Sequence, residues 1–371
     1  MLNSRRIVFV LGNLELGGAE RQALMLAQYL VEHEGAQVEV WGLTKSGPVA
    51  EICAQHGIPS RVVPYPLHGH SIAALPDTCQ ALREAKPDIL LPYTLRPNVL
   101  CGLIWMNTGA RLCVWNQRDE GLLPLPNSRE GLAARLTPLL ISNSAAGARF
   151  LAKLGVDSAK VNVIPNGVAL SAPESDRRAW RERLDVDDQC FVACMVANLH
   201  TNKDHATLLH AWGSVVSKLG ADGRDALLVL AGRRDGAYES LAALAVELKI
   251  GDSVRFTGPV SDVSGLLGAV DVGVFSSRSE GCPNAVLESM AAGLPVAGTD
   301  IEGIREVVGP VGARFLAAPG DADALAAVLT TLANDPQLCA ELGVQNRERV
   351  RNNYDSGRMC KETAALLATI H

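Results

Sequence analysis

Aromatic residues are scarce in this chain: Phe, Trp and Tyr together make up 4% of its 371 residues. Proteins that hold single-stranded nucleic acid stack the bases on aromatic side chains, so this class is disfavoured. An excess of positive charge is also missing, because 34 Lys and Arg residues face 40 Asp and Glu residues, for a net charge of −6. No nucleic-acid partner is expected, since nucleic-acid phosphates attract basic proteins.

Long apolar runs are missing as well. The longest, such as residues 99–106, have about eight residues, whereas a membrane-spanning helix needs about 20. The start Ser4-Arg5-Arg6 faintly resembles a twin-arginine export signal, but the apolar stretch after it covers only residues 7–11. We interpret that stretch as a buried first strand and expect a cytoplasmic protein.

Zinc-type C-x-x-C pairs are absent among the nine cysteines, and the number of cysteines is odd. Several cysteines lie in apolar, strand-like runs: Cys113 in RLCVW, and Cys190 and Cys194 in CFVACMVA. We interpret them as small buried hydrophobic residues of a protein in a reducing compartment.

What the chain does have is the composition of a globular protein, with 48% apolar and 20% charged residues. Its length is too great for one ordinary core and fits two domains. Residues 1–166 hold 15 basic and 13 acidic residues, a net charge of +2, and the rest of the chain carries −8. A mildly basic first half would suit an anionic partner such as a membrane surface, but ordinary surface variation explains the difference as well.

Strand-like and helix-like segments alternate along the first half. Residues 6–11 (RIVFVL) are apolar throughout, which is typical of a strand covered on both faces, and residues 19–34 have apolar side chains at helical spacing. Further strands are predicted at residues 38–43, 61–63, 88–92, 111–115, 139–142 and 161–164. This alternation predicts right-handed βαβ units around a parallel sheet.

The alternation restarts after a linker-like segment, PNGVALSAPESDR, which contains two prolines. Strands are then predicted at residues 190–197, 226–231, 253–256, 271–276 and 294–298, and helices at 204–219, 238–248, 285–292 and 356–370. We assign a first domain to residues 1–168, a linker to 169–177, a second domain to 178–355 and a C-terminal helix to 356–371, packed back on the first domain. The predicted fold is α/β, with two Rossmann-like, doubly wound domains that face a central cleft.

The strongest chemical signal is the run SSRSEGCPNAVLESMAAGLPV in the second half. A polar loop with Gly281 and Pro283 follows a strand, and Asn284 stands at the expected N-cap of the next helix. Backbone N–H groups at a helix start favour an anion such as a phosphate. Glu280 and Glu288 would accept hydrogen bonds from hydroxyls on either side of a diphosphate, as a sugar nucleotide offers them. Two solvated glutamates near a helix are the alternative.

This run keeps Glu280-x7-Glu288 within S-x-x-x-E-G-x-P-N-x-x-L-E-x-M-A-x-G-x-P-V, and the sequence GIRE follows at residues 303–306. The chain therefore resembles the retaining glycosyltransferases of family 4, which have the GT-B architecture. The resemblance implies that Glu280 contacts hydroxyls of the donor sugar and that Glu288 holds the ribose. It also implies that the loop and helix start bind the diphosphate or the sugar through Gly281, Pro283, Asn284, Ala285 and Val286.

A second segment, VANLHTNKDH, follows the first predicted strand of the second domain. A lysine there, Lys203, would neutralise a diphosphate as a compact charge, and Asp204 is expected to cap the next helix. We expect His200 and His205 to pack or cap. The family has an Arg and a Lys five residues apart here, but this chain has Asn198 in place of the Arg. Another arginine must compensate, or the neutral amide of Asn198 binds the donor instead.

In the first half, LGGAER follows the first strand and resembles the family's G-G-A-E-R loop, which faces the donor phosphates and sugar. Gly17 and Gly18 would let the backbone approach the donor closely. Arg21 is either the compensating cation or a salt-bridge partner on its helix. Smaller matches are IPNGV before the linker and FTGPV, whose Gly258 would belong to the loop that reads the nucleobase.

The segment WNQRDE follows the predicted strand RLCVW, where many family members carry a histidine that contacts a donor-sugar hydroxyl. No histidine occurs here. Asn116, Gln117 or Arg118 would fill that space and contact the acceptor, and Arg118 would bind an anionic group. A polar loop with an Arg-Asp pair is the alternative.

The resemblance as a whole implies a hexosyltransferase that moves a sugar from a nucleotide-sugar donor, with UDP favoured, to a hydroxyl of a glycan or lipid-linked acceptor. Bacterial surface polysaccharide or glycoconjugate synthesis is the expected setting. It also implies retention of the anomeric configuration, no cofactor and no bound metal. Glu280, Lys203 and Arg118 are the residues expected to act in the reaction, with Lys203 and helix amides stabilising the leaving diphosphate.

The acceptor is less well specified. Residues 127–140, with a capping-box-like Asn127 and Glu130, would suit an interfacial helix and peripheral membrane association, or form a plain surface helix. Two other functions stay open. One is a GT-B sugar-nucleotide epimerase, which needs no second substrate, and the other is a nucleotide-sugar-binding protein without catalysis.

Overall fold

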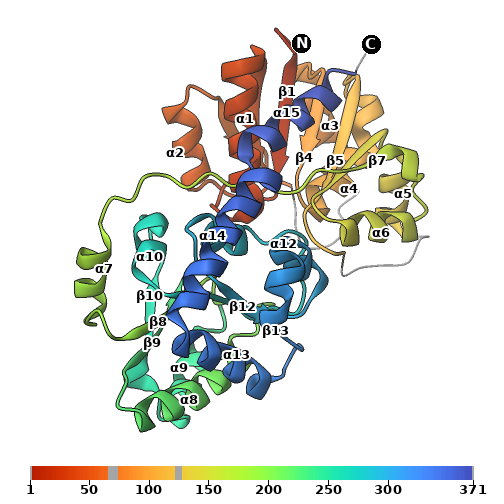
Figure 1. Ribbon diagram of the computed structural model, residues 1–371. Helices are drawn as coiled ribbons and strands as arrows, with labels where there is room; N and C mark the ends of the chain where they lie inside the picture. Colours follow the sequence, from red (N-terminus) through yellow and green to blue (C-terminus); the bar gives the residue numbers. More distant parts are fainter. Residues whose placement is uncertain (1, 66–73, 122–127, 370–371) are drawn as a thin grey trace. The chain divides into compact units, whose positions relative to one another are not determined.

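The computed structural model describes residues 2–65, 74–121 and 128–369 and divides into two compact units (Figure 1). Unit 1 comprises Met1–Gly167 and Ser356–His371, and unit 2 comprises Val168–Asp355. The segment after residue 355 therefore groups with the N-terminal residues. Within the described ranges, no helix combines the length and apolar character that a bilayer crossing requires.

The sheet of unit 1 has seven parallel strands in the described residues, in the order β3-β2-β1-β4-β5-β6-β7. These strands are β1 Arg6–Leu11, β2 Gln37–Gly42, β3 Ser60–Val62, β4 Ile89–Pro92, β5 Leu112–Gln117, β6 Leu139–Ser142 and β7 Val161–Val163. The order reverses between β1 and β4, where Ile7 pairs with both Val38 and Ile89. At such reversals α/β sheets bind ligands, at the carboxyl ends of the strands.

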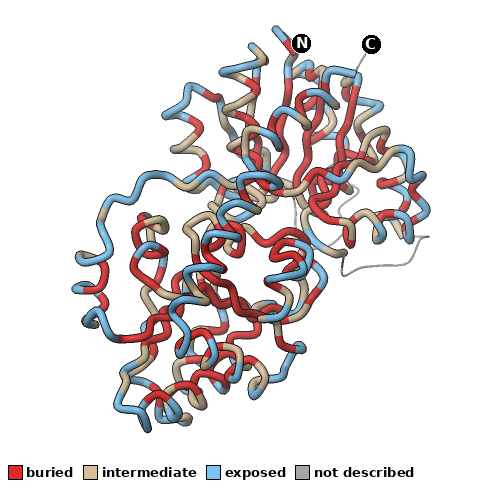
Figure 2. Tube along the Cα trace, viewed as in Figure 1, coloured by how far each residue is buried: buried red, intermediate tan, exposed pale blue. Residues whose placement is uncertain are grey.

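Helices cover both faces of this sheet. They are α1 Gly18–Glu34, α2 Pro48–Gln55, α3 Leu75–Ala85, α4 Leu95–Ile104, α5 Arg129–Leu136, α6 Ala145–Lys153 and α15 Ser356–Leu367, with short 3₁₀ helices at Trp105–Asn107 and Ser158–Lys160. In β1, Ile7, Phe9 and Leu11 pack with α1, α2 and α15, whereas Val8 and Val10 pack with α3 and α4. The strand is apolar at nearly every position because both faces are buried (Figure 2).

The sheet of unit 2 has six parallel strands in the described residues, in the order β10-β9-β8-β11-β12-β13. These strands are β8 Phe191–Val196, β9 Ala226–Ala231, β10 Val254–Gly258, β11 Val272–Phe275, β12 Val296–Thr299 and β13 Leu316–Ala317. The order again reverses, here between β8 and β11. The sequence pattern did not predict β13, because two residues carry no periodic signal.

Two helical layers flank this second sheet. Its helices are α7 Arg177–Leu184, α8 His205–Ala221, α9 Tyr238–Glu247, α10 Val263–Ala269, α11 Asn284–Ala291, α12 Glu302–Gly312 (kinked at Gly309), α13 Ala322–Asn334 and α14 Pro336–Asn353, with 3₁₀ helices at Gly251–Ser253 and Ala313–Phe315. In β8, Ala193 and Met195 pack with α8, α11 and α13, whereas Val192 and Cys194 pack with α7 and α10. Both units are thus doubly wound α/β folds, as predicted.

The cysteines are all free, and seven of the nine are buried. Burial raises the pKa of the Cys53 and Cys190 thiols to about 11, so both are protonated at neutral pH. The interpretation of these residues as small hydrophobic side chains is therefore confirmed for most of them.

The predicted cap of the helix near residue 127 is corrected by the structure. Asn127 lies outside the described residues, and Ser128 is the N-cap of α5, where its Oγ accepts a hydrogen bond from Gly131 N at 3.2 Å. Serine fills the N-cap as well as asparagine does, so the helix start is displaced by one residue from the predicted one.

Candidate functional site

The loops that follow β8, β9 and β11 carry most of the polar residues singled out in the second half of the sequence. Because these three strands are neighbours in a parallel sheet, their carboxyl ends lie at one edge of unit 2 (Figure 1). A backbone bridge between Lys203 and Ser277 joins the loop after β8 to the loop after β11. The predicted residues are therefore collected at the edge where such sheets bind ligands.

Lys203 and Glu280 are in direct contact. Lys203 Nζ donates to Glu280 Oε1, and the two side chains are 29% and 17% exposed. Each charge therefore holds the other in place while remaining accessible from one side. The two residues lie 77 positions apart in the chain, and the sequence predicted them for one site without predicting their contact.

Two residues that the sequence analysis missed position this pair. Ser277 Oγ donates to Glu280 Oε1 at 2.9 Å. The backbone of Ser277 is in turn clamped by Thr299 Oγ1, which accepts from Ser277 N at 3.0 Å and donates to Ser277 O at 2.8 Å. Thr299 is the last residue of β12, so its role follows from the pairing of β11 with β12 and has no local sequence signal.

The start of α11 differs from the prediction by one residue. Pro283, with φ −74° and ψ 114°, is the N-cap, and Asn284 is the first helical residue. Pro283 has no side chain that accepts a hydrogen bond, so the first turn has no side-chain cap. Such a helix start is suited to an anionic ligand. Glu288 lies one turn further along the helix and is partly exposed.

The loop between β11 and α11 runs close to the start of α12. A Cβ atom added at Gly303 would collide with the carbonyl oxygens of Glu280 and Gly281. This contact gives the run GIRE a physical reason to accompany the glutamate motif. Gly258, at the end of β10, has φ +73°, a left-handed conformation that favours glycine.

Asn198, which the resemblance aligned with an arginine, uses its amide oxygen within the protein. Its Oδ1 accepts a hydrogen bond from Arg233 N at 3.1 Å, which fixes the loop after β9. The guanidinium of Arg233 lies near Asp235, with Nε 3.6 Å from Oδ1. Arg233 thus lies beside Asn198, a placement that only the pairing of β8 with β9 reveals.

Both histidines near Lys203 make structural contacts, as predicted. His200 Nδ1 accepts from Asn202 N at 3.2 Å, and His205 is 1% exposed, with Nδ1 3.2 Å from Lys203 O. Burial lowers the pKa of His205 to about 4, so its ring is neutral at physiological pH. Asp204 is the N-cap of α8, although its carboxylate accepts from the Thr207 hydroxyl, at 2.8 Å, and not from a backbone N–H.

In unit 1, the glycine loop after β1 leads into α1. Gly17 is the N-cap, Gly18 is the first helical residue, and Gly17 O accepts from Arg21 N at 3.0 Å. A Cβ atom added at Gly17 would lie 2.6 Å from Glu20 Oε2, so the loop is closed against its own helix.

Asn116 and Gln117, the last residues of β5, are buried and hydrogen-bonded internally. Asn116 Nδ2 donates to Pro92 O at 2.9 Å, and Gln117 Oε1 accepts from Trp115 Nε1 at 3.0 Å. Of the three residues predicted to face an acceptor, only Arg118 is more than marginally exposed. A sequence motif fixes the position of these amides but not which way they point.

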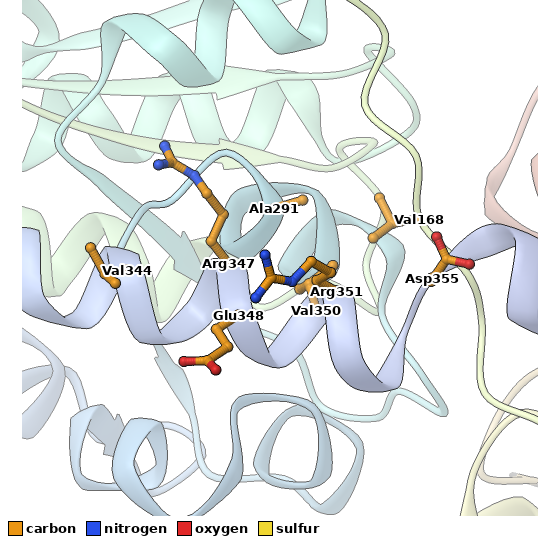
Figure 3. Close-up of a pocket in the computed structure, with 8 residues that line it drawn as sticks. All are labelled: Val168, Ala291, Val344, Arg347, Glu348, Val350, Arg351 and Asp355. Atoms are coloured by element: carbon orange, nitrogen blue, oxygen red, sulfur yellow. The ribbon is translucent and has the colours of Figure 1, made fainter.

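The structure also has a cavity that the sequence did not predict. It has a volume of about 570 Å³ (Figure 3). Its lining comes from α11, from α14, which contributes Arg347 and Arg351, and from Val168 and Asp355, the first and last residues of unit 2. Arg347 Nη2 donates to Ala292 O at 2.8 Å, so one of the two arginines is held by the protein itself. None of the predicted site residues lines this cavity. In the described part of the chain, no group of three or more His, Cys, Asp or Glu side chains is arranged to hold a metal ion.

Comparisons with known proteins match both halves of the chain. The family model "Glycosyltransferase Family 4" matches residues 16–172, and "Glycosyl transferases group 1" matches residues 176–349. An MMP alpha-(1->4)-mannosyltransferase of Mycolicibacterium hassiacum is 30% identical over 240 residues, which are 63% of this chain and 54% of that protein. An N-acetyl-alpha-D-glucosaminyl L-malate synthase of Bacillus anthracis is 29% identical over 188 residues, 50% of this chain and 48% of that protein. The chain thus spans about half the length of the curated relatives it matches.

Solved structures share the fold at low sequence identity. The crystal structure of Anabaena HepE in complex with UDP and glucose has a TM-score of 0.84 and 22% identity, and the match covers 98% of this chain and all of that one. The fold of the two units is therefore the GT-B fold.

Proposed function

Because the chain belongs to glycosyltransferase family 4, we propose that it is a retaining hexosyltransferase that moves a sugar from a nucleotide-sugar donor to an acceptor hydroxyl. The observation that carries this proposal is the contact of Lys203 with Glu280 at the edge from which α11 starts. A UDP-sugar is the favoured donor, which the complex of HepE with UDP and glucose supports.

In this proposal the donor diphosphate lies between Lys203 Nζ and the first-turn N–H groups of α11, including those of Ala285 and Val286. Both groups favour negative charge, one as a cation and the other through the partial positive charge of a helix start. Glu280, held by Lys203 and Ser277, accepts hydrogen bonds from hydroxyls of the donor sugar. Glu288 accepts from the ribose, and the backbone around Gly258 contacts the nucleobase.

The reaction is a group transfer with no protein nucleophile. The bond from the anomeric carbon to the donor phosphate breaks, and the acceptor oxygen bonds to the same face of that carbon. The departing phosphate oxygen takes the proton of the acceptor hydroxyl. Lys203 and the helix amides stabilise the charge that leaves with the diphosphate, a role that a metal ion fills in other enzymes.

The cation that is missing at Asn198 is replaced, in this proposal, by Arg233. Asn198 fixes the backbone of Arg233, so the guanidinium starts from a defined point next to the family's usual arginine position. Its Nε lies 3.6 Å from Oδ1 of Asp235, so in this proposal a phosphate competes with that carboxylate for the guanidinium. Arg233→Gln should therefore weaken binding of UDP but not of uridine.

The acceptor belongs to unit 1 in this proposal, and peripheral membrane association accompanies it. Leu132 and Leu136 of α5 are 46% and 36% exposed and lie four residues apart, on one face of the helix. Exposed leucines beside arginines are typical of an interfacial helix and would bring the enzyme to a lipid-linked acceptor. Leu132→Gln should then reduce co-sedimentation with anionic vesicles, whereas Val246→Gln, at an exposed position of α9, should not.

The test of the function is release of nucleoside diphosphate from UDP-, GDP- and ADP-hexoses, with and without bacterial glycan and lipid extracts. We expect release with at least one donor, stimulated by extract, and a loss of about 100-fold in Glu288→Gln but not in the exposed control Glu239→Gln. An epimerase would interconvert the free donor without extract, and a binding protein would bind UDP without turnover. Either result would reject the transferase.

A further inference from the structure

The guanidinium of Arg118 is fixed at the carboxyl edge of the sheet in unit 1. Its Nη1 donates to Asn166 Oδ1 at 3.1 Å, and its Nη2 donates to Asn116 Oδ1 at 3.0 Å. The group lies over the ring of Tyr93, 4.7 Å from the ring centroid. Arg118 follows β5 and Tyr93 follows β4, so the site lies one strand from the reversal between β1 and β4.

The partners of Arg118 are rigid. Asn116 is fully buried and exchanges two backbone hydrogen bonds with the side chain of Asn98, at 2.7 and 3.1 Å. Asn143 Nδ2 donates to the carbonyl of Arg118 at 3.2 Å and holds the backbone as well. The side chain therefore has little freedom to lose when it binds something, which strengthens binding.

The guanidinium of Arg118 lacks both a negatively charged partner and part of its hydrogen bonds. Its hydrogen-bond partners are neutral amides, and among the described residues no carboxylate forms an ion pair with it. Arg118 Nε is buried without a partner, and so are the Tyr93 hydroxyl and Asn143 Oδ1. These three are half of the six buried, unpartnered side-chain atoms in the described part of the chain. Native proteins rarely leave such atoms unsatisfied unless a ligand or water serves them.

The adjacent acid does not compensate the charge. Asp119 Oδ1 accepts from Gln117 Nε2 at 2.6 Å and from Gly121 N at 2.8 Å. Burial raises the pKa of the Asp119 carboxyl, opposite to the direction that a neighbouring guanidinium would impose.

Arg181 in unit 2 is a buried structural arginine, and it has both the hydrogen-bond acceptors and the carboxylate that its charge requires. It is 2% exposed, and its guanidinium donates to the carbonyl oxygens of Asp187, Cys190 and Ala269, with Asp271 Oδ2 3.7 Å away. Arg118 has the same rigidity without the counter-charge.

We propose that Arg118 binds an oxyanion of the acceptor, a phosphate or a carboxylate, so that the enzyme glycosylates anionic acceptors. This inference rests on the proposed function. A partly buried cation without an acid is costly, and an oxyanion supplies both the charge and the acceptors that the remaining N–H groups lack. Asn116 and Asn166 act as positioning residues that aim the guanidinium.

The experiment measures binding of matched probes to the full chain by calorimetry: glucose 6-phosphate, glucuronate and uncharged glucose. We expect the two anions to bind the native protein more tightly than glucose, and Arg118→Gln to weaken them at least 10-fold without affecting glucose. The control Arg96→Gln removes the same charge at an exposed position of α4 and should bind like the native protein. Equal anion affinity in the native protein and Arg118→Gln would overturn the proposal.

Two further measurements keep the result interpretable. Arg118→Lys retains the charge without the planar fork, so it should keep an intermediate anion affinity even if Arg118→Gln folds poorly. Vesicles of phosphatidylcholine with and without phosphatidate test whether the oxyanion is a lipid headgroup. Retention on phosphatidate vesicles that Arg118→Gln abolishes supports a lipid source, and retention that is unchanged while the soluble probes lose affinity supports a soluble one.

UDP binding and acceptor-free UDP release are measured in the same variants. They should be unchanged in the control Arg96→Gln, so that a loss of anion binding is separated from a general effect of a lost surface charge. If the native protein turns over no donor, the proposed function fails, whereas the anion-binding result stands or falls on the calorimetry alone.

Discussion

A basic residue lies at the carboxyl edge of each sheet, and the two residues differ in whether an acidic side chain pairs with them. At the edge of unit 2, Lys203 is paired with a carboxylate, Glu280, that is itself proposed to bind substrate. At the edge of unit 1, Arg118 has only amide partners and an aromatic ring. Both cations are partly buried and both are held in one position.

The difference indicates two ways of keeping a charged site stable before a ligand arrives. A Lys–Glu pair compensates its own charge, so a diphosphate must compete with Glu280 for Lys203, and Glu280 then becomes available for sugar hydroxyls. The guanidinium of Arg118 has only amide partners, so an anion can bind it without displacing a carboxylate. A diphosphate that binds in unit 2 therefore rearranges the Lys203–Glu280 ion pair. An oxyanion that binds in unit 1 forms a new ion pair with Arg118.

The largest effect should come from removing the paired cation. Lys203→Ala takes away the compact charge proposed to stabilise the departing diphosphate, and it leaves Glu280 without its ion-pair partner. We expect turnover of the donor to fall at least 100-fold, measured as UDP release at saturating donor. Lys218→Ala, at an exposed position of α8, serves as the control. Wild-type turnover in Lys203→Ala would mean that the charge at this edge has no part in the reaction.

A smaller effect should follow from loosening the support of the same pair. Thr299→Val has nearly the same shape but no hydroxyl to clamp the backbone of Ser277, so Glu280 loses its orientation. We expect a decrease in kcat of about 10-fold, corresponding to a hydrogen bond of about 1.4 kcal/mol, with little change in the affinity for UDP. The matched substitution Thr330→Val removes a hydroxyl that bonds only within α13 and should leave kcat unchanged. Equal kcat values in the two variants would contradict the positioning role.

A third effect is on stability, does not change turnover at neutral pH, and appears only in acid. His205, buried beneath Lys203, has a folded-state pKa of about 4, below the value of about 6.5 in an unfolded chain. The folded state therefore binds fewer protons, and stability that is complete above pH 6.5 decreases as the pH falls towards 4. At pH 5 this loss amounts to about 2 kcal/mol.

The substitution His205→Asn keeps a donor near the position of Nδ1 and removes the titration. The free energy of unfolding of the full chain, measured in urea, should fall less between pH 7 and pH 5 in this variant than in the native protein. Identical losses would assign the acid sensitivity to other groups.

The sequence predicted most of the fold because a buried parallel strand can be recognised from its own apolar run, without knowledge of the strands that pair with it. The runs at 6–11, 139–142 and 226–231 match β1, β6 and β9 residue for residue. The strands are apolar on both faces, so their limits coincide with the first polar residues or turns. β13, with two residues, has no such signal.

The site was predictable only as far as local motifs carry it. Spacing and the family resemblance predicted Glu280, Lys203 and the start of α11 for one site, and the structure brings the first two into contact and has the helix cap one residue from the predicted position. Thr299 and Arg233 act across strand pairs, and pairing is a long-range property that no short motif records. The burial of Asn116 and Gln117 likewise depends on which way the end of β5 faces, which a motif does not state.

The packing of α15 has a consequence for how the chain folds during synthesis. Met359, Cys360 and Leu367 complete the core of unit 1 against α1, and the side chain of Gln22 exchanges two hydrogen bonds with the backbone of Gly167, at 2.8 and 3.1 Å. The N-terminal part leaves the ribosome first, but its apolar groove stays open until the last helix emerges. The core of unit 1 is thus completed only after unit 2 has been synthesised, and until then the apolar side chains that α15 covers stay exposed.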